Sequence, residues 1–115
     1  MCYHSFVLVR FTHDARREFL GMPLAEREAM RNAIGKLEAS GDGLVYPHSS
    51  SVRGATNLRE LRPRAGRSPW RGFYRRIGVE LVIGAFGPEA QADPHGFARA
   101  VGSAELRLDA EDIRS

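Results

Sequence analysis

Hydrophobic and polar residues in the first half of the chain alternate in one strand-like run and then in two helical stripes. Residues 5–11 are rich in branched and aromatic side chains and predict a short buried strand. Asp14 can cap a short helix that ends at Gly21. A second helix is predicted between Pro23 and Gly41, because apolar residues recur there at helical spacing. These residues are Met30, Ala33, Ile34 and Leu37.

The second half of the chain predicts a polar loop followed by three strands. The loop covers residues 46–57, where polar residues are punctuated by proline and glycine. The predicted strands are residues 58–63, 69–76 and 79–86, since each combines apolar and β-favouring side chains. The tight connection around Gly78 is typical of an antiparallel hairpin.

A last helix completes the predicted order of elements. Asp93 followed by Pro94 indicates its N-terminus, and the chain after Asp109 is expected to fray. The order is then an N-terminal strand, two helices, a three-stranded antiparallel meander and a C-terminal helix, which predicts an α+β fold. We expect the helices on one face of the sheet and the second face free for binding. The length predicts a single domain over residues 1–115.

Charge is distributed unevenly along this fold. The formal net charge is only +3, but residues 53–76 hold many arginines and a single acid, Glu60. Arginine stays charged at any working pH and binds phosphate through two parallel N–H donors. The pattern therefore favours RNA or DNA as the partner. The arginines of this segment are Arg53, Arg59, Arg62, Arg64, Arg67, Arg71, Arg75 and Arg76.

Other residue types exclude several classes of protein. Cys2 is the only cysteine, so the sequence predicts neither an internal disulfide nor a thiolate metal cluster. We expect no cofactor and no metal site, because the histidines lack close-paired ligand spacing. No secretory signal and no membrane-spanning run is visible, which favours a cytoplasmic protein. The histidines are His4, His13, His48 and His95.

Strand alternation divides the residues of the first two meander strands into an inner and an outer set. Leu61, Trp70 and Tyr74 share one parity, and we expect them to pack against the helices. The other parity then faces outward and places one carboxylate beside three guanidinium groups, with one ring suited to base stacking. These outward residues are Glu60, Arg62, Arg71, Arg75 and Phe73.

The preceding polar loop adds two candidates, His48 and Arg53, because it leads into the first of these strands. Together the side chains match metal-independent RNA cleavage by 2′-hydroxyl attack. Guanidinium groups would stabilise charge on the phosphoryl oxygens, and His48 or Glu60 would transfer protons. Two alternatives are open: an acidic partner protein could cover this face, and Glu60 could be a structural ion-pair partner. The predicted RNA-binding residues are Arg53, Arg62, Arg71, Phe73 and Arg75.

Five short motifs keep the order and spacing of one known family. They are PHSSSVRG (residues 47–54), LRELR (58–62), WRGFY (70–74), LVIGAF (81–86) and the Asp93-Pro94 pair that opens the last helix. Together they resemble the RelE/ParE superfamily of bacterial toxins, and most closely the phage-derived HigB-like branch of type II toxin–antitoxin systems. The resemblance extends roughly over residues 6–108.

This resemblance implies a compact ribonuclease-like fold and cleavage of mRNA, often on the ribosome, which inhibits translation. It also implies control by a cognate antitoxin, commonly a helix-turn-helix protein. Residue by residue, it implies a phosphate-binding and catalytic role for Arg71. It also matches Glu60 and Arg62 to the glutamate and arginine of the family's Glu-Leu-Arg motif. It further implies that His48 lies in a loop where some members place a catalytic base.

One departure from the family pattern bears on activity. Related toxins carry two lysines shortly after the last strand, but here Phe86 is followed by Gly87, Pro88 and Glu89. Cationic charge is therefore missing where it would help to hold RNA. This departure keeps two alternatives open: a non-catalytic ParE-like inhibitor of DNA gyrase, and a degenerate binding module on the same fold.

Overall fold

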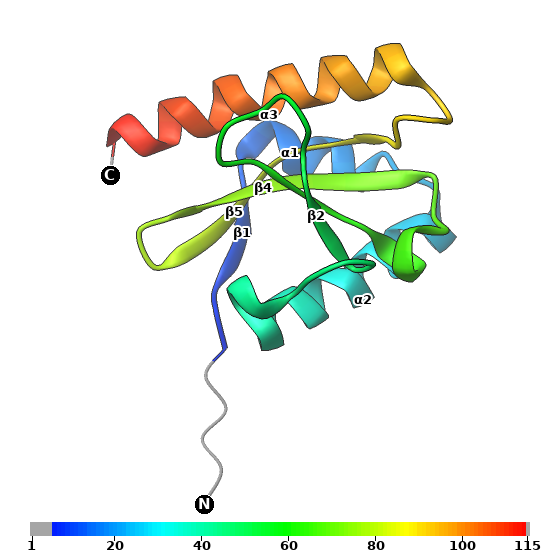
Figure 1. The fold of residues 1–115 in the computed structure, drawn as a ribbon, viewed down its shortest axis with the longest axis horizontal. Helices are drawn as coiled ribbons and strands as arrows, with labels where there is room; N and C mark the ends of the chain where they lie inside the picture. The colour runs from blue at the N-terminus through cyan, green and yellow to red at the C-terminus, as the bar shows by residue number, and fades with distance from the viewer. Residues whose placement is uncertain (1–5, 115) are drawn as a thin grey trace, which may run out of the picture.

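The protein folds around one mixed five-stranded sheet, seen in a computed structural model that describes residues 6–114 (Figure 1). The strands lie in the order β1-β5-β4-β3-β2. β1 pairs with β5 in parallel, and all other neighbours are antiparallel. The α+β class is therefore confirmed, with a wider sheet than the predicted meander. The strands are β1 (Val9–Phe11), β2 (Ser49–Ser51), β3 (Arg59–Leu61), β4 (Trp70–Ile77) and β5 (Glu80–Pro88).

Three helices flank the sheet: α1 (His13–Leu20), α2 (Leu24–Ser40) and α3 (Pro94–Arg114). α1 begins two residues earlier than the sequence suggested, because Thr12 and not Asp14 is its N-cap, and the side chain of Thr12 accepts the cap hydrogen bond from the backbone N–H of Ala15. Two short 3₁₀ helices, η1 (Gly41–Gly43) and η2 (Pro63–Gly66), follow α2 and β3. Within residues 6–114, no helix is long and apolar enough to cross a membrane.

The prediction that all helices lie on one face of the sheet is wrong. Figure 1 shows α3 above the sheet and α2 below it. Two separate hydrophobic clusters follow from this, one for each face. β5 explains the arrangement, since its residues 81–87 are all buried and a strand with two apolar faces needs cover on both. Ile83 and Phe86 belong to the α1–α2 cluster, and Val82 and Ala85 belong to the α3 cluster.

A close approach between α3 and β5 determines which part of the sheet is covered. The register of β4 and β5 shifts between Phe73 and Tyr74, and Gly84 is the extra residue of β5. A Cβ atom on Gly84 would lie 2.7 Å from Cγ of Leu108, and one on Gly87 would lie 2.5 Å from Cβ of Ala100. The glycines thus allow α3 to lie directly on β5, and α3 also contacts β4.

Several boundaries differ from the sequence prediction, and β1 covers only Val9–Phe11 of the strand predicted over residues 5–11. The polar loop contains the edge strand β2, which was missed because its buried residue is Ser49, whose hydroxyl is hydrogen-bonded to the hydroxyl of Tyr74. β3 is shorter than predicted because Pro63 starts η2. α3 continues beyond Asp109 to Arg114 rather than fraying. The first residue of the predicted N-terminal strand, like Cys2 and His4, lies outside the described residues.

Candidate functional site

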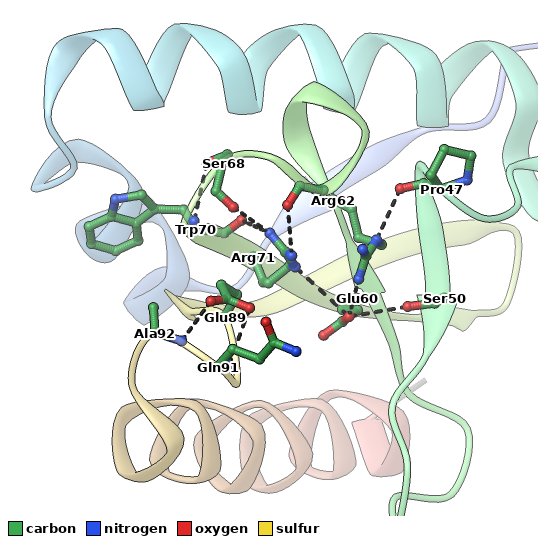
Figure 2. Close-up of polar contacts among 11 residues, drawn as sticks. Pro47, Ser50, Glu60, Arg62, Ser68, Trp70, Arg71, Glu89, Gln91 and Ala92 are labelled. Carbon is green, nitrogen blue, oxygen red and sulfur yellow. Dashed lines mark hydrogen bonds and ion pairs between the residues drawn. The ribbon is translucent and has the colours of Figure 1, made fainter.

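Side chains from β2, the end of β3 and the start of β4 converge on the carboxylate of Glu60 (Figure 2). Ser50 is paired directly opposite Glu60, and its hydroxyl donates a hydrogen bond to Oε1 over 3.1 Å. Nη1 of Arg62 donates to the same oxygen over 2.9 Å. Nε of Arg71 lies 3.8 Å from it. The predicted grouping of Glu60, Arg62 and Arg71 on one face is therefore present. We call these three residues together with Ser50 the Glu60 cluster.

Arg71 is held rigidly inside this cluster. Its side chain is 4% exposed. Nη1 donates to the carbonyl oxygens of Ser68 and Trp70 over 2.6 and 3.0 Å, and Nη2 donates to that of Gly66 over 3.2 Å. Nε is buried and has no hydrogen-bond partner among the described residues. Burial lowers the pKa of Arg71, and the neighbouring charge of Arg62 lowers it further, whereas Glu60 and Glu89 oppose the shift.

The tight turn of η2 supplies one carbonyl partner of Arg71, that of Gly66, and packs against Arg62. Arg64, Ala65 and Gly66 all have positive φ angles, of 54°, 55° and 92°. Gly66 is needed for two reasons. Its left-handed conformation is one that residues with a side chain rarely adopt, and a Cβ atom there would lie 2.5 Å from Nη2 of Arg62. The turn therefore brings the backbone of η2 against both Arg62 and Arg71.

Arg62 is fixed on its other side by the segment before β2. Its Nε donates to the carbonyl oxygen of Pro47 over 3.0 Å. Its guanidinium carbon lies 5.0 Å from the ring centroid of Tyr46, close enough for a cation–π contact. Nη2 makes no hydrogen bond within residues 6–114, and the side chain is 17% exposed. Arg62 therefore lies at the partly exposed edge of the cluster, held between the segment before β2 and η2.

His48 and Arg53 lie near the cluster in sequence but are not part of it. The carbonyl oxygen of His48 accepts a hydrogen bond from the backbone N–H of Arg62 over 2.9 Å. His48 and Arg62 also line a cavity of about 330 Å³ beside α2. Arg53 is exposed in the loop after β2 and forms no ion pair with any described residue. Neither residue is brought into contact with Glu60 or Arg71 in this conformation.

Two of the predicted outward residues are buried, and for them the sequence prediction is wrong. Phe73 is 0% exposed and packs edge-on against Phe97 of α3, with ring centroids 5.4 Å apart, so it offers no stacking surface. Arg75 is 7% exposed, and its Nη1 donates to Asp109 of α3 over 2.6 Å. Their parity was assigned correctly, but α3 covers this part of the face. The ion pair between Arg75 and Asp109 therefore links α3 to the sheet.

Glu89 occupies the position where the family pattern would place a basic residue. Its carboxylate accepts hydrogen bonds from the backbone N–H groups of Gln91 and Ala92, over 3.2 and 2.6 Å, and so shapes the turn before α3. It also lies on the Arg71 side of the Glu60 cluster (Figure 2). Its charge raises the pKa of Arg71. Two carboxylates thus balance the two guanidinium groups here.

Sequence reasoning assigned no role to two residues that complete the site, Ser50 and Tyr46. Ser50 gains its role only through the pairing of β2 with β3, and a run of serines gives no strand signal. Tyr46 would have required knowledge that the chain folds back on Arg62. Among residues 6–114 there is no group of three or more His, Cys, Asp or Glu side chains able to hold a metal ion.

The arrangement is suited to binding an anion at a fixed place. Backbone carbonyl oxygens hold both guanidinium groups, that of Arg71 on β4 and that of Arg62 directly after β3. Nε of Arg71 is left without a hydrogen bond in the described chain. Preorganised donors of this kind stabilise negative charge strongly, because they need not reorganise when the charge develops. The Glu60 carboxylate now lies between the two guanidinium groups, where it accepts a hydrogen bond from Nη1 of Arg62 and lies 3.8 Å from Nε of Arg71.

Known proteins with the same fold are bacterial toxins. A doubly arginine-to-alanine substituted form of the Escherichia coli toxin RelE, in its free state, superposes with a TM-score of 0.61 at 18% identity, over 84% of this chain and 96% of RelE. The toxin–antitoxin complex RelBE2 of Mycobacterium tuberculosis contains a chain that matches with a TM-score of 0.57 at 23% identity, over 76% and 97% of the two chains. The RelE mutant bound to a peptide of its antitoxin, RelBc, gives 0.58 at 15% identity, over 82% and 94%.

Sequence similarity identifies the family to which the chain belongs. No curated protein matches the chain. Residues 17–83, more than half of the sequence, match the family described as "Phage derived protein Gp49-like (DUF891)". This agrees with the phage-derived branch that the motifs indicated, and the solved structures confirm the predicted resemblance to RelE at the level of the fold. The chain therefore belongs to the Gp49-like family of phage-derived proteins and has the fold of the RelE toxins.

Proposed function

We propose that this protein is the toxin of a type II toxin–antitoxin pair and that it cleaves mRNA without a metal ion. The observation that carries the proposal is the convergence of Arg62 and Arg71 on Glu60, with both guanidinium groups fixed by backbone carbonyl oxygens. The fold supports the same conclusion, because the solved structures that share it are described as toxins. A protein that acts on mRNA would work in the cytoplasm.

In this proposal an RNA phosphate replaces the Glu60 carboxylate as the partner of the two arginines. Nη1 of Arg62, which now donates to Glu60, and Nε of Arg71 supply its hydrogen bonds, and the exposed Arg53 adds a cation for a neighbouring phosphate. Arg71 cannot move away from the substrate, since three carbonyl oxygens hold it. Phe73 and Arg75 take no part, because both are buried beneath α3.

The reaction is an intramolecular transfer within the RNA. A base removes the proton of a 2′-hydroxyl, whose oxygen attacks the adjacent phosphorus, and the bond to the 5′-oxygen breaks to leave a 2′,3′-cyclic phosphate. The departing 5′-oxygen takes up a proton. Arg71 stabilises charge on the phosphoryl oxygens. Glu60 and His48 are the candidates for proton transfer, and Glu60→Gln and His48→Gln variants distinguish them by their pH–rate profiles.

We further propose a cognate antitoxin as the partner that controls this activity. The M. tuberculosis RelBE2 structure is a toxin–antitoxin complex, and RelE is bound to an antitoxin peptide in another. A small helix-turn-helix protein encoded beside this gene is the expected candidate. Co-expression of the two proteins followed by purification of the complex tests this partnership, and failure of the pair to associate would contradict it.

One observation favours a second function on the same fold. Glu60 and Glu89 together balance Arg62 and Arg71, and the lysines of the family pattern are replaced by Pro88 and Glu89. A neutral cluster suits a protein that binds without cleaving. The alternative is therefore a ParE-like inhibitor of DNA gyrase, or a binding module without toxicity.

Induced expression in bacteria, followed by sequencing of RNA 5′ ends, separates these functions. The nuclease proposal expects new 5′ ends inside mRNAs within minutes of induction, and their loss in an Arg62→Ala variant. Arg16→Ala is the matched control, because it removes the same charge from an exposed position on α1. Thermal unfolding shows whether each variant is folded. Growth inhibition with DNA damage and intact mRNA would instead support the gyrase alternative, and folded protein without toxicity would support the binding module.

A further inference from the structure

A cavity of about 330 Å³ adjoins the Glu60 cluster, between α2 and the segment from β3 to η2. Its size is that of small-ligand sites, which begin near 300 Å³. Beside the exposed Ala25, its apolar lining has four buried small or branched side chains. These are Ala29, Ala33, Leu44 and Leu61. All four are at least nine-tenths buried, so the apolar surface is part of the fold and not a chance gathering of exposed groups.

The rest of the lining is polar and mainly cationic. Lys36, Arg62 and Arg64 line the cavity, against a single carboxylate among the described lining residues, that of Glu28. Asn32, which is exposed on α2, contributes an amide with both donor and acceptor groups. An apolar floor with a positive rim and one amide suits a flat aromatic ring that carries hydrogen-bonding edges and is attached to an anion.

Arg62 connects this cavity to the phosphate site. It lines the cavity, yet its Nη1 is hydrogen-bonded to Glu60. Figure 2 shows Arg62 between η2 and Glu60, with α2 crossing above it. Tyr46 lies against the Arg62 guanidinium and is 70% exposed, so an aromatic face is also available beside the site. Aromatic side chains and arginine planes are the groups on which unpaired bases commonly stack.

We propose that this cavity binds one unpaired nucleobase of the RNA, while the phosphate of the same nucleotide lies at Arg62. The inference rests on the proposed function for its ligand and adds a base-reading pocket to it. His48, which lines the same cavity, then faces the nucleotide from the side opposite α2. The cavity selects among bases through Asn32, whose amide reaches hydrogen-bonding groups on the edge of the ring.

The first test uses short 2′-O-methyl RNAs, which cannot undergo 2′-hydroxyl attack, with one abasic position moved along the strand. When the abasic site is at one particular position, the affinity for the RNA is expected to fall about ten-fold, in keeping with the loss of a stacked base. Ala33→Leu fills the cavity and should remove that penalty while lowering affinity for the intact RNA. Asn32→Ala, at an exposed position, should reduce the difference in affinity between RNAs that carry different bases at this position. Ala39→Leu, exposed on the same helix, is the control and should bind as the parent does.

The second test separates this inference from the proposed function. Nucleoside 5′-monophosphates are titrated into isotope-labelled protein, and saturable shifts of the Asn32 side-chain amide are expected in the parent but not in folded Ala33→Leu. If monophosphates bind here while RNA is neither bound nor cleaved, the nuclease proposal fails and the pocket stands. If RNA binds with no sensitive abasic position, and both cavity variants match the parent, the pocket is refuted. The pocket would also be refuted if the Asn32 side-chain amide signals shift with a partner protein but not with nucleotides.

Discussion

Replacing Glu60 with glutamine probes the phosphate site directly. The Glu60 carboxylate accepts hydrogen bonds from Ser50 and Arg62 and lies 3.8 Å from Nε of Arg71, so it carries the charge that now balances both arginines. Glutamine has nearly the same shape and keeps an oxygen that can accept the first two bonds. The substitution therefore removes the charge and changes the packing little. We expect the variant to bind RNA more tightly than the parent does.

The structure allows a rough magnitude. Two unit charges about 4 Å apart interact by about 4 kcal/mol at an effective dielectric constant of about 20. A phosphate against Nε of Arg71 would come about that close to the Glu60 charge and be repelled by it. The side chain of Glu60 is 13% exposed and can rotate toward solvent, so most of this repulsion is relieved. We expect a net gain of about 1.4 kcal/mol, which is about ten-fold in affinity.

The assay is fluorescence anisotropy of a labelled 2′-O-methyl RNA at several salt concentrations. Glu60→Gln should bind about ten-fold more tightly and should show a steeper salt dependence, because an additional phosphate contact adds about 0.7 to the slope for single strands. Glu105→Gln removes the same charge from α3 and should match the parent. Cleavage is measured separately and should fall by about 10²–10⁴ if Glu60 is the base. Folded Glu60→Gln protein that binds RNA no better than the parent would refute the reasoning.

Other substitutions test the fold and the wider RNA surface. Gly84→Ala should lower the free energy of unfolding, measured in urea, by about 1–3 kcal/mol, because a Cβ atom there collides with α3. Gly102→Ala, with open space around it, should raise the free energy of unfolding by up to about 1 kcal/mol. Equal effects of the two substitutions would contradict the close packing of α3 on Gly84. The pKa of Glu26 is lowered from 4.5, chiefly by a hydrogen bond from Arg64. The unfolded state therefore binds protons more readily, and the stability that Glu26 confers should be present above pH 4.5 and lost as pH falls through the lower, folded-state pKa. Urea unfolding of parent and Glu26→Gln from pH 3 to 7 checks this, and a difference that grows toward acid would oppose it. Arg53→Ala should leave stability unchanged but reduce the salt slope of RNA binding by about 0.7, and an unchanged slope would remove Arg53 from the interface.

Three members of the Glu60 cluster, Glu60, Arg62 and Arg71, could be predicted from the sequence because their placement depends on strand alternation. Leu61 and Tyr74 are buried on the α1–α2 face, as their parity required. Glu60, Arg62 and Arg71 then had to share the other face, whichever helices covered it. The family motifs pointed to the same residues. Local periodicity was sufficient here, because all of these positions lie within two adjacent antiparallel strands or directly after one.

The extent of the open face could not be predicted in the same way, since it depends on where α3 packs. Phe73 and Arg75 have the parity of Arg71, yet the close contact of α3 with Gly84 places the helix over them. The sequence held one sign of this cover, because Phe73 is an apolar ring between Arg71 and Arg75 on the same face of the strand. β2 escaped prediction for a different reason: the buried residue of this strand is Ser49, which is satisfied by a hydrogen bond to Tyr74 and not by apolar packing.

The most direct measurement is a crystal structure of the protein with a 2′-O-methyl RNA that spans several nucleotides. We expect one phosphate within hydrogen-bonding distance of Nη1 of Arg62 and Nε of Arg71, with the Glu60 carboxylate turned away from its present position between the two arginines. RNA bound over another surface, or a phosphate that leaves both arginines with their present partners, would contradict the claim that these two fixed guanidinium groups form the substrate site.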